Sequence, residues 1–577
     1  MMLRSCGLQT LRSAPRPSLA APLKESCGKR WAQACYSTQA QRKPNEVDVI
    51  VVGSGCSGLT AALAAAKHGL DVLVLEKTQY FGGTTATSGG GMWLPNNKYQ
   101  PIMGITDSTE KADEYLQNLL GPLYDQQKIA AFLKSAPEML EWLEANSHMQ
   151  FQPVPAPDYH QSRPGASVGR TLLTKGSFDG RQLGNLIKDV RYPIQGVAVF
   201  GSMQADWTLL PILSNPLGSV SNFMASVRIL SRYAFDLIRW GKGTVMMNGN
   251  ALVGRLLASL QTEGVQLWNN VPAQGPILDN GRVVGLKVLR DGQELSVHAR
   301  KGVVLASGGF GRSPEAKNYV PHEWCAAPRG NTGDGKRIGV ESGGALPAKN
   351  PENAVFAPIS LLEVPGQPTR RFPHFFDRAK PGSIFVDTNG KRFANESAPY
   401  QNFVAAMHEK GIEKAFYIAD HTYLRKYGMG MAFPAPYPIG KLLRQKYLLS
   451  APTIAELAGR IGVPKENLEK TIAQFNSFAE TGKDLEYHRG EEPNDRFYGD
   501  PSVAPNPSLG ACKTGPFYAL PVYPGNVSTI YGLSTNIDAQ VVDARGRRFQ
   551  VCMRWAVIRT RYSRAFVRAL DPVLVPV

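Results

Sequence analysis

The sequence has no long uncharged apolar run. None of its apolar stretches approaches the roughly 18–20 residues that a membrane-spanning helix needs. The 577 residues are 43% hydrophobic and 19% charged, which is ordinary for a globular protein, and they suffice for two domains or more. The composition therefore predicts a globular chain with a large core.

Cysteine is scarce and scattered. The seven Cys form no C-x-x-C pair and have no histidine at a spacing suited to zinc. A disulfide framework and a metal site are therefore not expected.

Acidic residues are nearly missing from both ends of the chain. Residues 1–45 and 545–577 each carry eight Lys or Arg against one acid, so each end contributes +7 to the net charge of +17. The body between is almost balanced, which argues against a nucleic-acid partner. The composition of 1–44 predicts a mitochondrial transit peptide. The alternative is a disordered basic extension on a cytoplasmic protein.

The strongest positive signal lies at 47–77. A β-branched apolar run predicts a strand, an Ala-rich run a helix, and DVLVLEK a second strand that ends at Glu76. Gly53, Gly55 and Gly58 have the G-x-G-x-x-G spacing, which allows a tight turn and brings a pyrophosphate to a helix N-terminus. Glu76 stands where a carboxylate accepts from ribose hydroxyls. We predict a dinucleotide site.

A second glycine-rich stretch, GGTTATSGGGMWLPNN, begins at Gly82 and favours FAD over NAD. A flavin needs further backbone donors along its ribityl chain and ring, and small residues let it approach the backbone. NAD remains the alternative for the first unit alone.

These elements are followed by GVVLASGGF from Gly302, TGDG from Thr332 and GKRFANESAPY from Gly390. The set resembles the FAD-dependent succinate dehydrogenase/fumarate reductase flavoprotein superfamily. Within it, SGGGMWLPNN and NESAPY resemble the 3-ketosteroid Δ1-dehydrogenases. The resemblance covers roughly 47–543 and implies an α/β fold, with a Rossmann-like FAD-binding domain and an inserted α+β substrate domain.

The texture of the sequence sets the expected domain boundaries. We expect a leader at 1–44, the FAD-binding domain at 47–345, the substrate domain at 346–510, a return to the first domain at 511–550 and an Arg-rich tail at 551–577. Within the first domain, 221–243 has apolar positions at helical spacing with Arg on the other face. This stretch could rest on a membrane surface or line the access route of an apolar substrate. A helix packed on the core is the alternative.

The resemblance implies an enzyme that oxidises a C–C single bond beside the 3-ketone of a steroid or steroid-like triterpenoid. FAD would be bound non-covalently, because the histidine of the covalent members is missing from the second glycine-rich stretch. The residues expected at the cofactor are Gly53, Gly55, Ser57, Gly58, Glu76, Lys77, Gly83, Thr84, Thr85, Ser88, Gly89, Gly90, Gly91, Val271 and Asp334. No motif identifies the electron acceptor.

The chemistry needs a base. A ketone acidifies the neighbouring C–H, so the site requires a base there and donors to the ketone oxygen, while the flavin accepts the hydride. The family's base is a tyrosine of the second domain, and Tyr400 of NESAPY matches it. A free phenol has a pKa of about 10, so Tyr400 needs a charge or a hydrogen bond that favours ionisation. A tyrosine packed at a domain interface is the structural alternative.

Two features depart from the family. A second tyrosine that assists the base is expected in the helix at 121–144, where Phe132 takes its register and Tyr124 lies nearby. The closing glycine-rich segment, which holds the flavin end and polarises the ketone, has no counterpart in 551–577. One hypothesis for that tail is a gene-model error, because translation through an unspliced splice-donor site can begin with Val-Cys, as at Val551-Cys552.

Two other functions stay open. A fumarate-reductase-like enzyme would grip a dicarboxylate with several cations, and Arg371, His374 and Arg378 form the cluster nearest to that pattern in the second domain. A defective flavoprotein would follow from the aberrant C-terminus.

Overall fold

A computed structural model describes residues 45–194, 198, 200–204, 212–213, 215–348 and 354–547. Two compact units divide the chain, Met1–Glu46 and Val47–Val577, and nearly all described residues belong to the second. The predicted leader at 1–44 and tail at 551–577 lie outside the described residues. No helix in the described ranges is both long and apolar enough to span a membrane.

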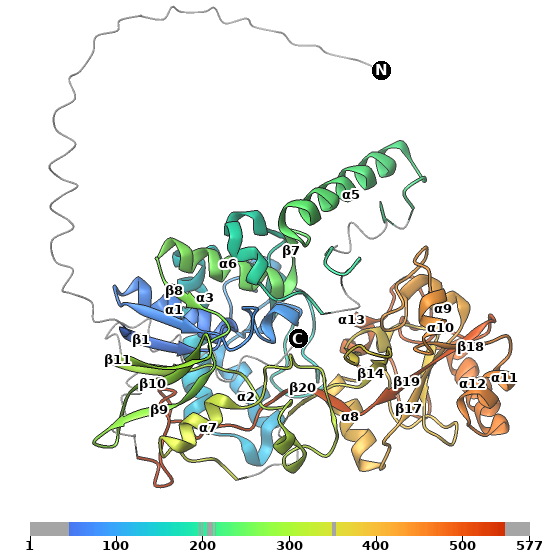
Figure 1. Cartoon of the computed structure of the whole chain (residues 1–577). Helices are drawn as coiled ribbons and strands as arrows, with labels where there is room; N and C mark the ends of the chain where they lie inside the picture. The colour runs from blue at the N-terminus through green and yellow to red at the C-terminus, as the bar shows by residue number, and fades with distance from the viewer. Residues whose placement is uncertain are drawn as a thin grey trace, which may run out of the picture. The chain divides into compact units, whose positions relative to one another are not determined.

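A six-stranded mixed sheet follows the N-terminal end, in the order β8-β2-β1-β11-β10-β9 (Figure 1). Its strands are β1 (Glu46–Val52), β2 (Val72–Leu75), β8 (Gln266–Trp268), β9 (Ala273–Asp279), β10 (Arg282–Arg290) and β11 (Gln293–Leu305). Strands β1, β2 and β8 are parallel, with Val49 opposite Val72 and Leu73 opposite Gln266. The strand, helix and strand predicted at 47–77 are confirmed.

Both faces of this sheet are apolar. Val49 and Val51 of β1 pack in one core with α1 (Cys56–Lys67) and α6 (Asn248–Thr262), and Ile50 lies in a second core on the other side. A parallel sheet covered on both faces requires this pattern. A tight hairpin joins β9 and β10 at Asn280-Gly281, where both residues have positive φ, 49° and 74°, as such a turn needs.

The later half of the chain forms a second sheet, in the order β15-β14-β19-β17-β16, with β18 paired to β19. Its strands are β14 (Ile359–Leu362), β15 (Arg370–Pro373), β16 (Ser383–Val386), β17 (Ala415–Ala419), β18 (Leu449–Ala451) and β19 (Phe517–Tyr523). The helices of this second part are α8 (Tyr400–Glu409), α9 (His421–Tyr427), α10 (Gly440–Arg444), α11 (Ile454–Ile461), α12 (Lys465–Thr481) and α13 (Pro493–Tyr498). The two sheets confirm the predicted α/β fold with an inserted second part.

The chain leaves the second sheet later than expected. The sequence places a return to the first domain at 511–550, but β19 pairs with β14, β17 and β18 inside the second sheet. Strand β20 (Gly525–Thr529) then joins β12 (Trp324–Cys325) and β13 (Ala354–Phe356) in a small sheet. Beyond it, Leu533 and Val541 pack against the first sheet. The return therefore begins after Tyr523.

The remaining elements belong to the first half of the chain. They are β3 (Gly91–Trp93), β4 (Phe151–Val154), β5 (Thr171–Thr174), β6 (Phe178–Asp179), β7 (Val245–Met246), α2 (Thr109–Leu120), α3 (Gln126–Asn146), α5 (Val220–Trp240) and α7 (Asp334–Glu341). Helix α5 has only Ser226, Tyr233 and Asp236 buried. The alternative of a helix packed on the core through its apolar residues therefore does not hold.

Candidate active site

The turn between β1 and α1 has the geometry that the glycine spacing predicts. Gly53 has φ +105°, and a Cβ atom there would lie 2.3 Å from the carbonyl oxygen of Ala306. A Cβ at Gly58 would lie 2.0 Å from the carbonyl oxygen of Gly53. At Gly55 the nearest atom, Oγ1 of Thr85, would be 3.5 Å away. Gly53 and Gly58 therefore permit the fold itself, whereas Gly55 leaves room for a ligand.

The N-terminus of α1 lies at the same turn. Gly55 is its N-cap and provides no side-chain cap. The Cys56 N–H donates to Thr85 Oγ1 at 3.0 Å, and Ser57 and Gly58 complete the first turn. First-turn N–H groups have no acceptor within the helix, and they carry a positive partial charge that favours a phosphate.

The second glycine-rich stretch lies against the first. A Cβ at Gly83 would be 3.7 Å from the Cα of Gly55, so the two glycines face each other across a narrow gap. Next to Gly83, the Oγ1 of Thr84 accepts from Asn331 Nδ2 at 3.0 Å. Thr85 then bonds back to α1. The predicted residues of both stretches are thus brought together.

The rest of this stretch is shaped by its own hydrogen bonds. Ser88 Oγ donates to the Thr85 carbonyl at 2.8 Å and accepts from the Gly90 N–H at 3.1 Å. Gly90 has φ +68°, and a Cβ there would collide with the backbone of Asn248 at 2.4 Å. Gly89 lies between Ser88 and Gly90, and Gly91 begins β3. Gly90 is therefore needed for the close packing of the loop against Asn248.

Glu76 lies at the end of β2 and is 7% exposed. One carboxylate oxygen accepts from Ser54 Oγ, and the other accepts from the Thr78 N–H at 2.9 Å and its hydroxyl at 2.7 Å. Val271 is buried, and its N–H donates to the Glu76 carbonyl at 2.9 Å. The carboxylate is therefore fixed beside the glycine turn, because Ser54 belongs to that turn.

Lys77 and Asp334, both predicted at the cofactor, form an ion pair at 2.5 Å. Lys77 Nζ also donates to Thr332 Oγ1. Asp334 begins α7, and its neighbour Gly335 donates its N–H to Ser307 Oγ at 2.9 Å. The TGDG segment is in this way attached to the strand ends that surround the glycine turn.

These residues fit an FAD. The open backbone at Gly55 and Gly83 and the uncapped N-terminus of α1 suit a pyrophosphate. The fixed carboxylate of Glu76 suits a ribose, since the oxygen that accepts from Ser54 retains a lone pair, whereas the other oxygen accepts twice from Thr78.

Tyr400 lies far along the chain, at the first residue of α8, and is 2% exposed. Its hydroxyl accepts a hydrogen bond from the Tyr159 hydroxyl at 3.3 Å. Phe375 packs edge-on against the Tyr400 ring, with centroids 5.0 Å apart. A small cavity at this point is lined by Tyr159, Phe375, Phe376, Arg378, Ala379, Ser397, Ala398, Pro399, Tyr400, Asn494 and Tyr498.

Electrostatics around the pair favour Tyr400 as the base. Burial raises the pKa of Tyr400, while the hydrogen bond from Tyr159 and the charge of Arg378 act in the opposite direction. Burial and the neighbouring Tyr400 raise the pKa of Tyr159 well above its usual value. The positive end of α8 also favours negative charge at its first residue. Burial leaves the pKa of both hydroxyls above the usual value, but Tyr159 and Arg378 offset part of the rise at Tyr400, so Tyr400 is the better placed of the two to act as a base.

Tyr159 was not found from the sequence. The expected register at Phe132 does not hold: Phe132 is buried in the first core and stacks on Trp93, with centroids 6.2 Å apart. Tyr124 donates to Asp113 instead. Tyr159 comes from the irregular segment after β4, where its neighbour Asp158 is anchored by Arg170 and Trp93. No periodic pattern marks such a segment.

A buried ion network positions the loop before Tyr400. Arg392 pairs with Glu396 at 2.8 Å and with Asp484 at 2.7 Å, and Arg489 pairs with Glu396 at 3.2 Å. Burial by itself raises the pKa of Glu396, but Arg392 and Arg489 outweigh it and hold this pKa below its usual value. The charged residues of the RFANESAPY motif therefore help to fix the loop that carries Tyr400.

Asn494 has a polar group without a partner in this cavity. Its side chain is 2% exposed, and its Nδ2 finds no hydrogen-bond acceptor among the described residues. A buried amide donor costs free energy unless a ligand or a water accepts from it. Asn494 is therefore a candidate contact for a ligand next to Tyr400.

The cations expected of a dicarboxylate site are already engaged. His374 contacts Asp377 at 2.6 Å and Ser360 at 2.8 Å, and Arg371 donates to the Cys325 carbonyl. Arg378 donates four hydrogen bonds, all to main-chain carbonyls. His374 and Arg378 are therefore committed to other groups of the protein, whereas the buried Nε of Arg371 has no partner among the described residues.

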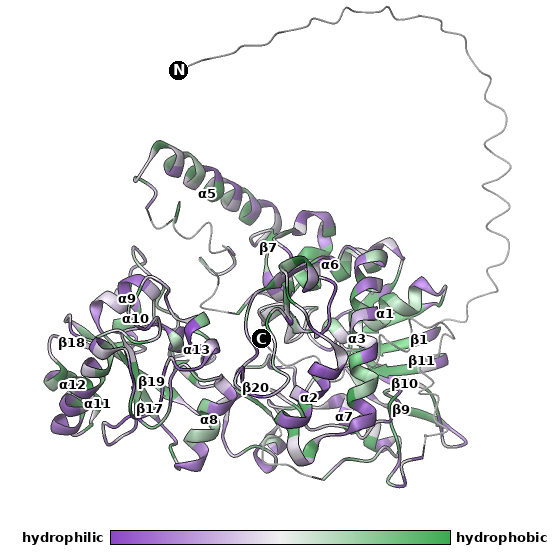
Figure 2. Cartoon of the chain, turned by 180° about the vertical axis from the view of Figure 1, so that it is seen from behind, coloured by the Kyte–Doolittle hydropathy of each residue, from purple (hydrophilic) through white to green (hydrophobic). Residues whose placement is uncertain are grey.

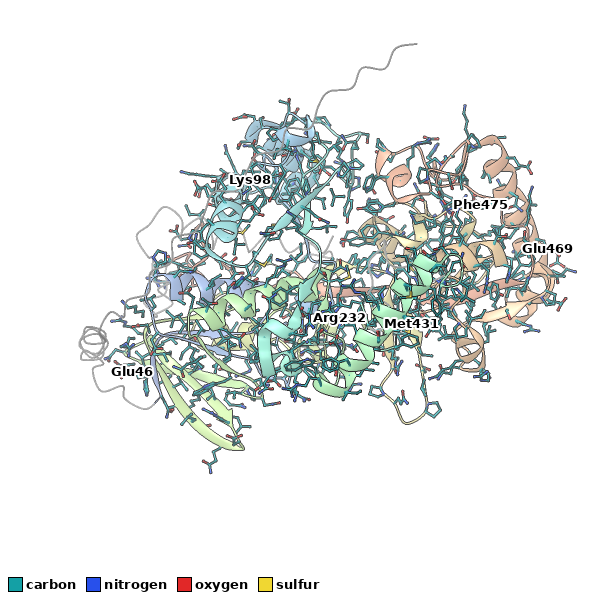
Figure 3. The ribbon with its side chains drawn as sticks, turned by 90° about the horizontal axis from the view of Figure 1, so that it is seen from above. Glu46, Lys98, Arg232, Met431, Glu469 and Phe475 are labelled. Atoms are coloured by element: carbon teal, nitrogen blue, oxygen red, sulfur yellow. The ribbon has the colours of Figure 1, made fainter. Side chains whose placement is uncertain are left out.

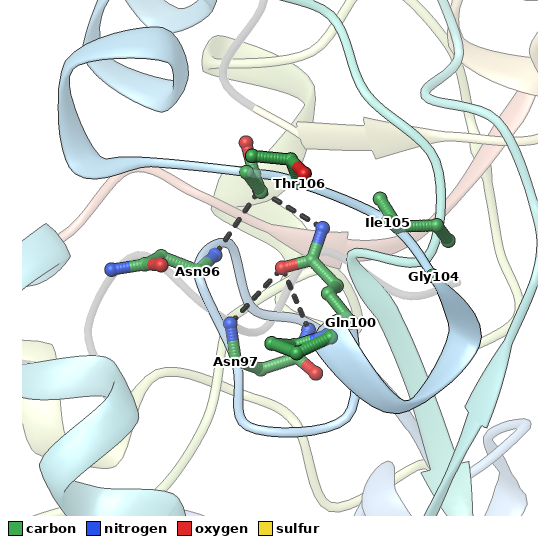
Figure 4. Close-up of a pocket in the computed structure, with 8 residues that line it drawn as sticks. Asn96, Asn97, Gln100, Gly104, Ile105 and Thr106 are labelled. Atoms are coloured by element: carbon green, nitrogen blue, oxygen red, sulfur yellow. Dashed lines mark hydrogen bonds between the residues drawn. The ribbon is translucent and has the colours of Figure 1, made fainter.

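A second hollow lies at the loop that follows SGGGMW (Figure 4). Asn97 donates to the carbonyls of Leu94 and Gly169, and Gln100 donates to Asp107, which also accepts from Arg170. The two asparagines of the motif therefore shape this loop, and the hollow has no reactive group of its own.

Comparison with known proteins agrees with this site. The model of the FAD binding domain family matches residues 48–550. The 4-oxocyclohex-2-ene-1-carboxylate 5-dehydrogenase of Sinomonas cyclohexanicum is 35% identical over 88% of this chain and 88% of its own length. The 3-oxosteroid 1-dehydrogenase of Mycobacterium tuberculosis is 34% identical over 86% of this chain and 90% of its own. These bacterial relatives lend no support to mitochondrial import.

A solved structure resembles the whole arrangement. The 3-ketosteroid Δ1-dehydrogenase of Sterolibacterium denitrificans, in complex with 1,4-androstadiene-3,17-dione, has a TM-score of 0.79 and 34% identity, and the match covers 88% of this chain and 93% of that one. The chain is therefore an FAD-dependent oxidoreductase, and it belongs to the FAD-binding flavoprotein family that includes the 3-oxosteroid 1-dehydrogenases.

Proposed function

We propose that this enzyme introduces a carbon–carbon double bond beside the 3-ketone of a steroid or steroid-like triterpenoid. The observation that carries the proposal is the pair of buried hydroxyls, Tyr159 and Tyr400, in a cavity with aromatic walls. A base of this kind suits a weakly acidic C–H beside a ketone, and aromatic walls suit an apolar ring.

The residues divide the work. Tyr400, ionised, takes the proton from the carbon next to the ketone, while the Tyr159 hydroxyl donates its one hydrogen to the Tyr400 oxygen and holds that oxygen in place. Arg378 adds positive charge close to Tyr400. FAD, when bound, accepts the hydride from the next carbon. Gly55, Gly83 and the N-terminus of α1 would hold its pyrophosphate.

An acidic ring ketone is the nearest competing substrate, since one relative is named for such a compound. A carboxylate would need a free cation in the cavity. Arg378 is the charged side chain that lines it, and four of its five N–H groups already meet main-chain carbonyls. The cavity therefore favours an uncharged ring.

The cavity wall must move for a ring to enter. The volume of the cavity beside Tyr400 is about 10 Å³, which is room for roughly one water molecule. Phe376 and Tyr498 stack with centroids 4.1 Å apart and close one side. Displacing this stack is the smallest change that would expose Tyr400.

The test is anaerobic addition of a 3-keto-4-ene steroid to the purified flavoprotein, with the oxidised flavin band followed by absorbance. We expect bleaching of the band, and we expect Tyr400→Phe to slow it by about 10²- to 10⁴-fold, as the loss of a general base does. The same steroid lacking the ketone is the control.

Other outcomes are informative. A band that bleaches with 4-oxocyclohexanecarboxylate and not with the steroid would replace the proposed substrate. A protein purified without a flavin band would point to the defective flavoprotein instead. Bleaching at an equal rate in Tyr400→Phe would overturn the role of the tyrosine pair.

A further inference from the structure

Helix α5 (Val220–Trp240) presents its apolar side chains to the solvent. Ile238 is 86% exposed and Phe235 is 60% exposed. The large apolar residues of α5 that are exposed are Val220, Phe223, Met224, Val227, Leu230, Phe235, Leu237 and Ile238. Figure 2 shows hydrophobic residues along the length of this helix. At 100° per residue they share one broad face, which we call the α5 apolar face.

The opposite, polar face attaches α5 to the rest of the protein. Asp236 accepts from the Thr244 N–H at 3.0 Å and from its hydroxyl at 2.6 Å. The Tyr233 hydroxyl donates to the Phe200 carbonyl at 2.9 Å. Arg232, marked in Figure 3, pairs with Asp179 at 3.3 Å. The helix is therefore anchored by its polar residues, so the exposure of its apolar face is built into the fold.

Positive charge borders the apolar face on one side. Arg228, Arg232 and Arg239 fall within a narrow sector of the helix, next to Phe235 and Met224. Arg228 and Arg239 are exposed. The single acid of α5, Asp236, is buried. The exposed part of the helix thus combines a wide apolar surface with cationic charge alone.

We propose that α5 binds the surface of an anionic lipid bilayer, with its apolar face inserted among the acyl chains and its arginines at the headgroups. A helix with this division of residues lies in the plane of a membrane interface. The charge pattern selects lipid over a second copy of the chain, because a copy offers no exposed acid on α5 to meet Arg228 and Arg239. The inference does not depend on which ketone the enzyme oxidises.

Sedimentation of the full chain with vesicles tests this. We expect the protein to pellet with phosphatidylcholine vesicles that contain phosphatidylglycerol, and much less with phosphatidylcholine alone. Arg228→Gln with Arg239→Gln should weaken binding to the anionic vesicles by about fivefold per arginine. Phe223→Ser with Phe235→Ser should lower the partition coefficient about tenfold or more.

Matched variants keep the test sharp. Leu485→Ser removes an equally exposed apolar side chain from another part of the fold and should pellet like the wild type. Flavin absorbance confirms that each variant is folded. Wild-type protein that stays in the supernatant with both vesicle types would overturn the proposal. A dimer in sedimentation velocity that Phe223→Ser with Phe235→Ser dissociates would assign the face to a second copy instead.

Discussion

At the scale of single residues, the Tyr159–Tyr400 contact should set the pH dependence of the proposed reaction. The hydrogen bond from Tyr159 lowers the pKa of Tyr400 against the effect of burial. Tyr159→Phe removes that donor, so the pKa of Tyr400 rises. We expect kcat/KM at neutral pH to fall by about tenfold to a hundredfold, as the loss of a hydrogen bond to a charged group does, and the rising limb of the pH profile to move to higher pH.

The control for this prediction is Tyr124→Phe, which removes a hydroxyl bonded to Asp113 rather than to Tyr400. Its pH profile should match that of the wild type. A Tyr159→Phe profile that falls in height without moving along the pH axis would show that Tyr159 only packs against the base.

Asn494 offers a second prediction at this scale. Asn494→Leu keeps the shape of the side chain but removes the unpartnered buried donor. We expect kcat/KM for the ketone to fall about tenfold, with no loss of thermal stability, because no protein hydrogen bond of Nδ2 is removed. Steady-state kinetics and a melting curve measure both. A large drop in melting temperature with unchanged kinetics would make Asn494 a structural residue.

At the scale of elements, the β1–α1 turn separates folding from cofactor binding. A methyl group at Gly55 would make only an ordinary van der Waals contact, with Thr85 Oγ1 at 3.5 Å, whereas one at Gly58 meets the Gly53 carbonyl oxygen at 2.0 Å. Gly55→Ala should therefore fold normally but bind less FAD, and Gly58→Ala should lose thermal stability. The flavin-to-protein absorbance ratio and a melting curve of the apoprotein distinguish the two.

Gly459→Ala, in α11, is the matched control, since nothing lies within 4 Å of its added Cβ. It should leave the flavin content unchanged and should not lower the melting temperature, because Ala is more favourable than Gly inside a helix. Full flavin content in Gly55→Ala would show that the backbone at this turn is not the pyrophosphate site.

The elements also show what a sequence can reveal. The glycine turn, Glu76 and Tyr400 were predictable because each belongs to a local pattern: a strand, a turn, a helix start or a short motif. Tyr159 was not, because it lies on an irregular segment fixed by Asp158 and Arg170. Helix α5 was recognised by its period, but a period cannot tell which face is anchored, and here the hydrogen bonds of the buried residues Asp236 and Tyr233 decide it. Strand β19 was expected in the first domain but pairs within the second sheet, because the residues of one strand do not reveal which strand lies beside it.

At the scale of the whole molecule, the ion network behind Tyr400 makes stability depend on pH. The pKa values of Glu396 and Asp484 are held below their usual values by Arg392 against the effect of burial. Their contribution is complete above the unfolded pKa values of about 4 and is lost as the pH falls toward the folded ones. Glu396→Gln should cost about 3–5 kcal/mol of unfolding free energy at neutral pH.

Chemical denaturation of both proteins at several pH values tests this. The wild type should lose stability more steeply than Glu396→Gln as the medium becomes acidic, since the variant has lost one of the two titrating groups. Parallel stability curves across that range would contradict the role of the network. Glu480→Gln, whose partner Lys513 is exposed, should lie within about 0.5 kcal/mol of the wild type.

The two hydroxyls of the proposed proton transfer, Tyr159 and Tyr400, are 241 residues apart in the chain. The residues expected at the cofactor, apart from Asp334, all come before residue 272. Tyr400, in contrast, follows the loop that the Arg392 ion network fixes. A polypeptide is synthesised from its N-terminus, so most of the residues expected at the cofactor are made long before Tyr400. On the proposed roles, a chain that ended before Tyr400 would hold most of the residues expected at the nucleotide but would lack the base.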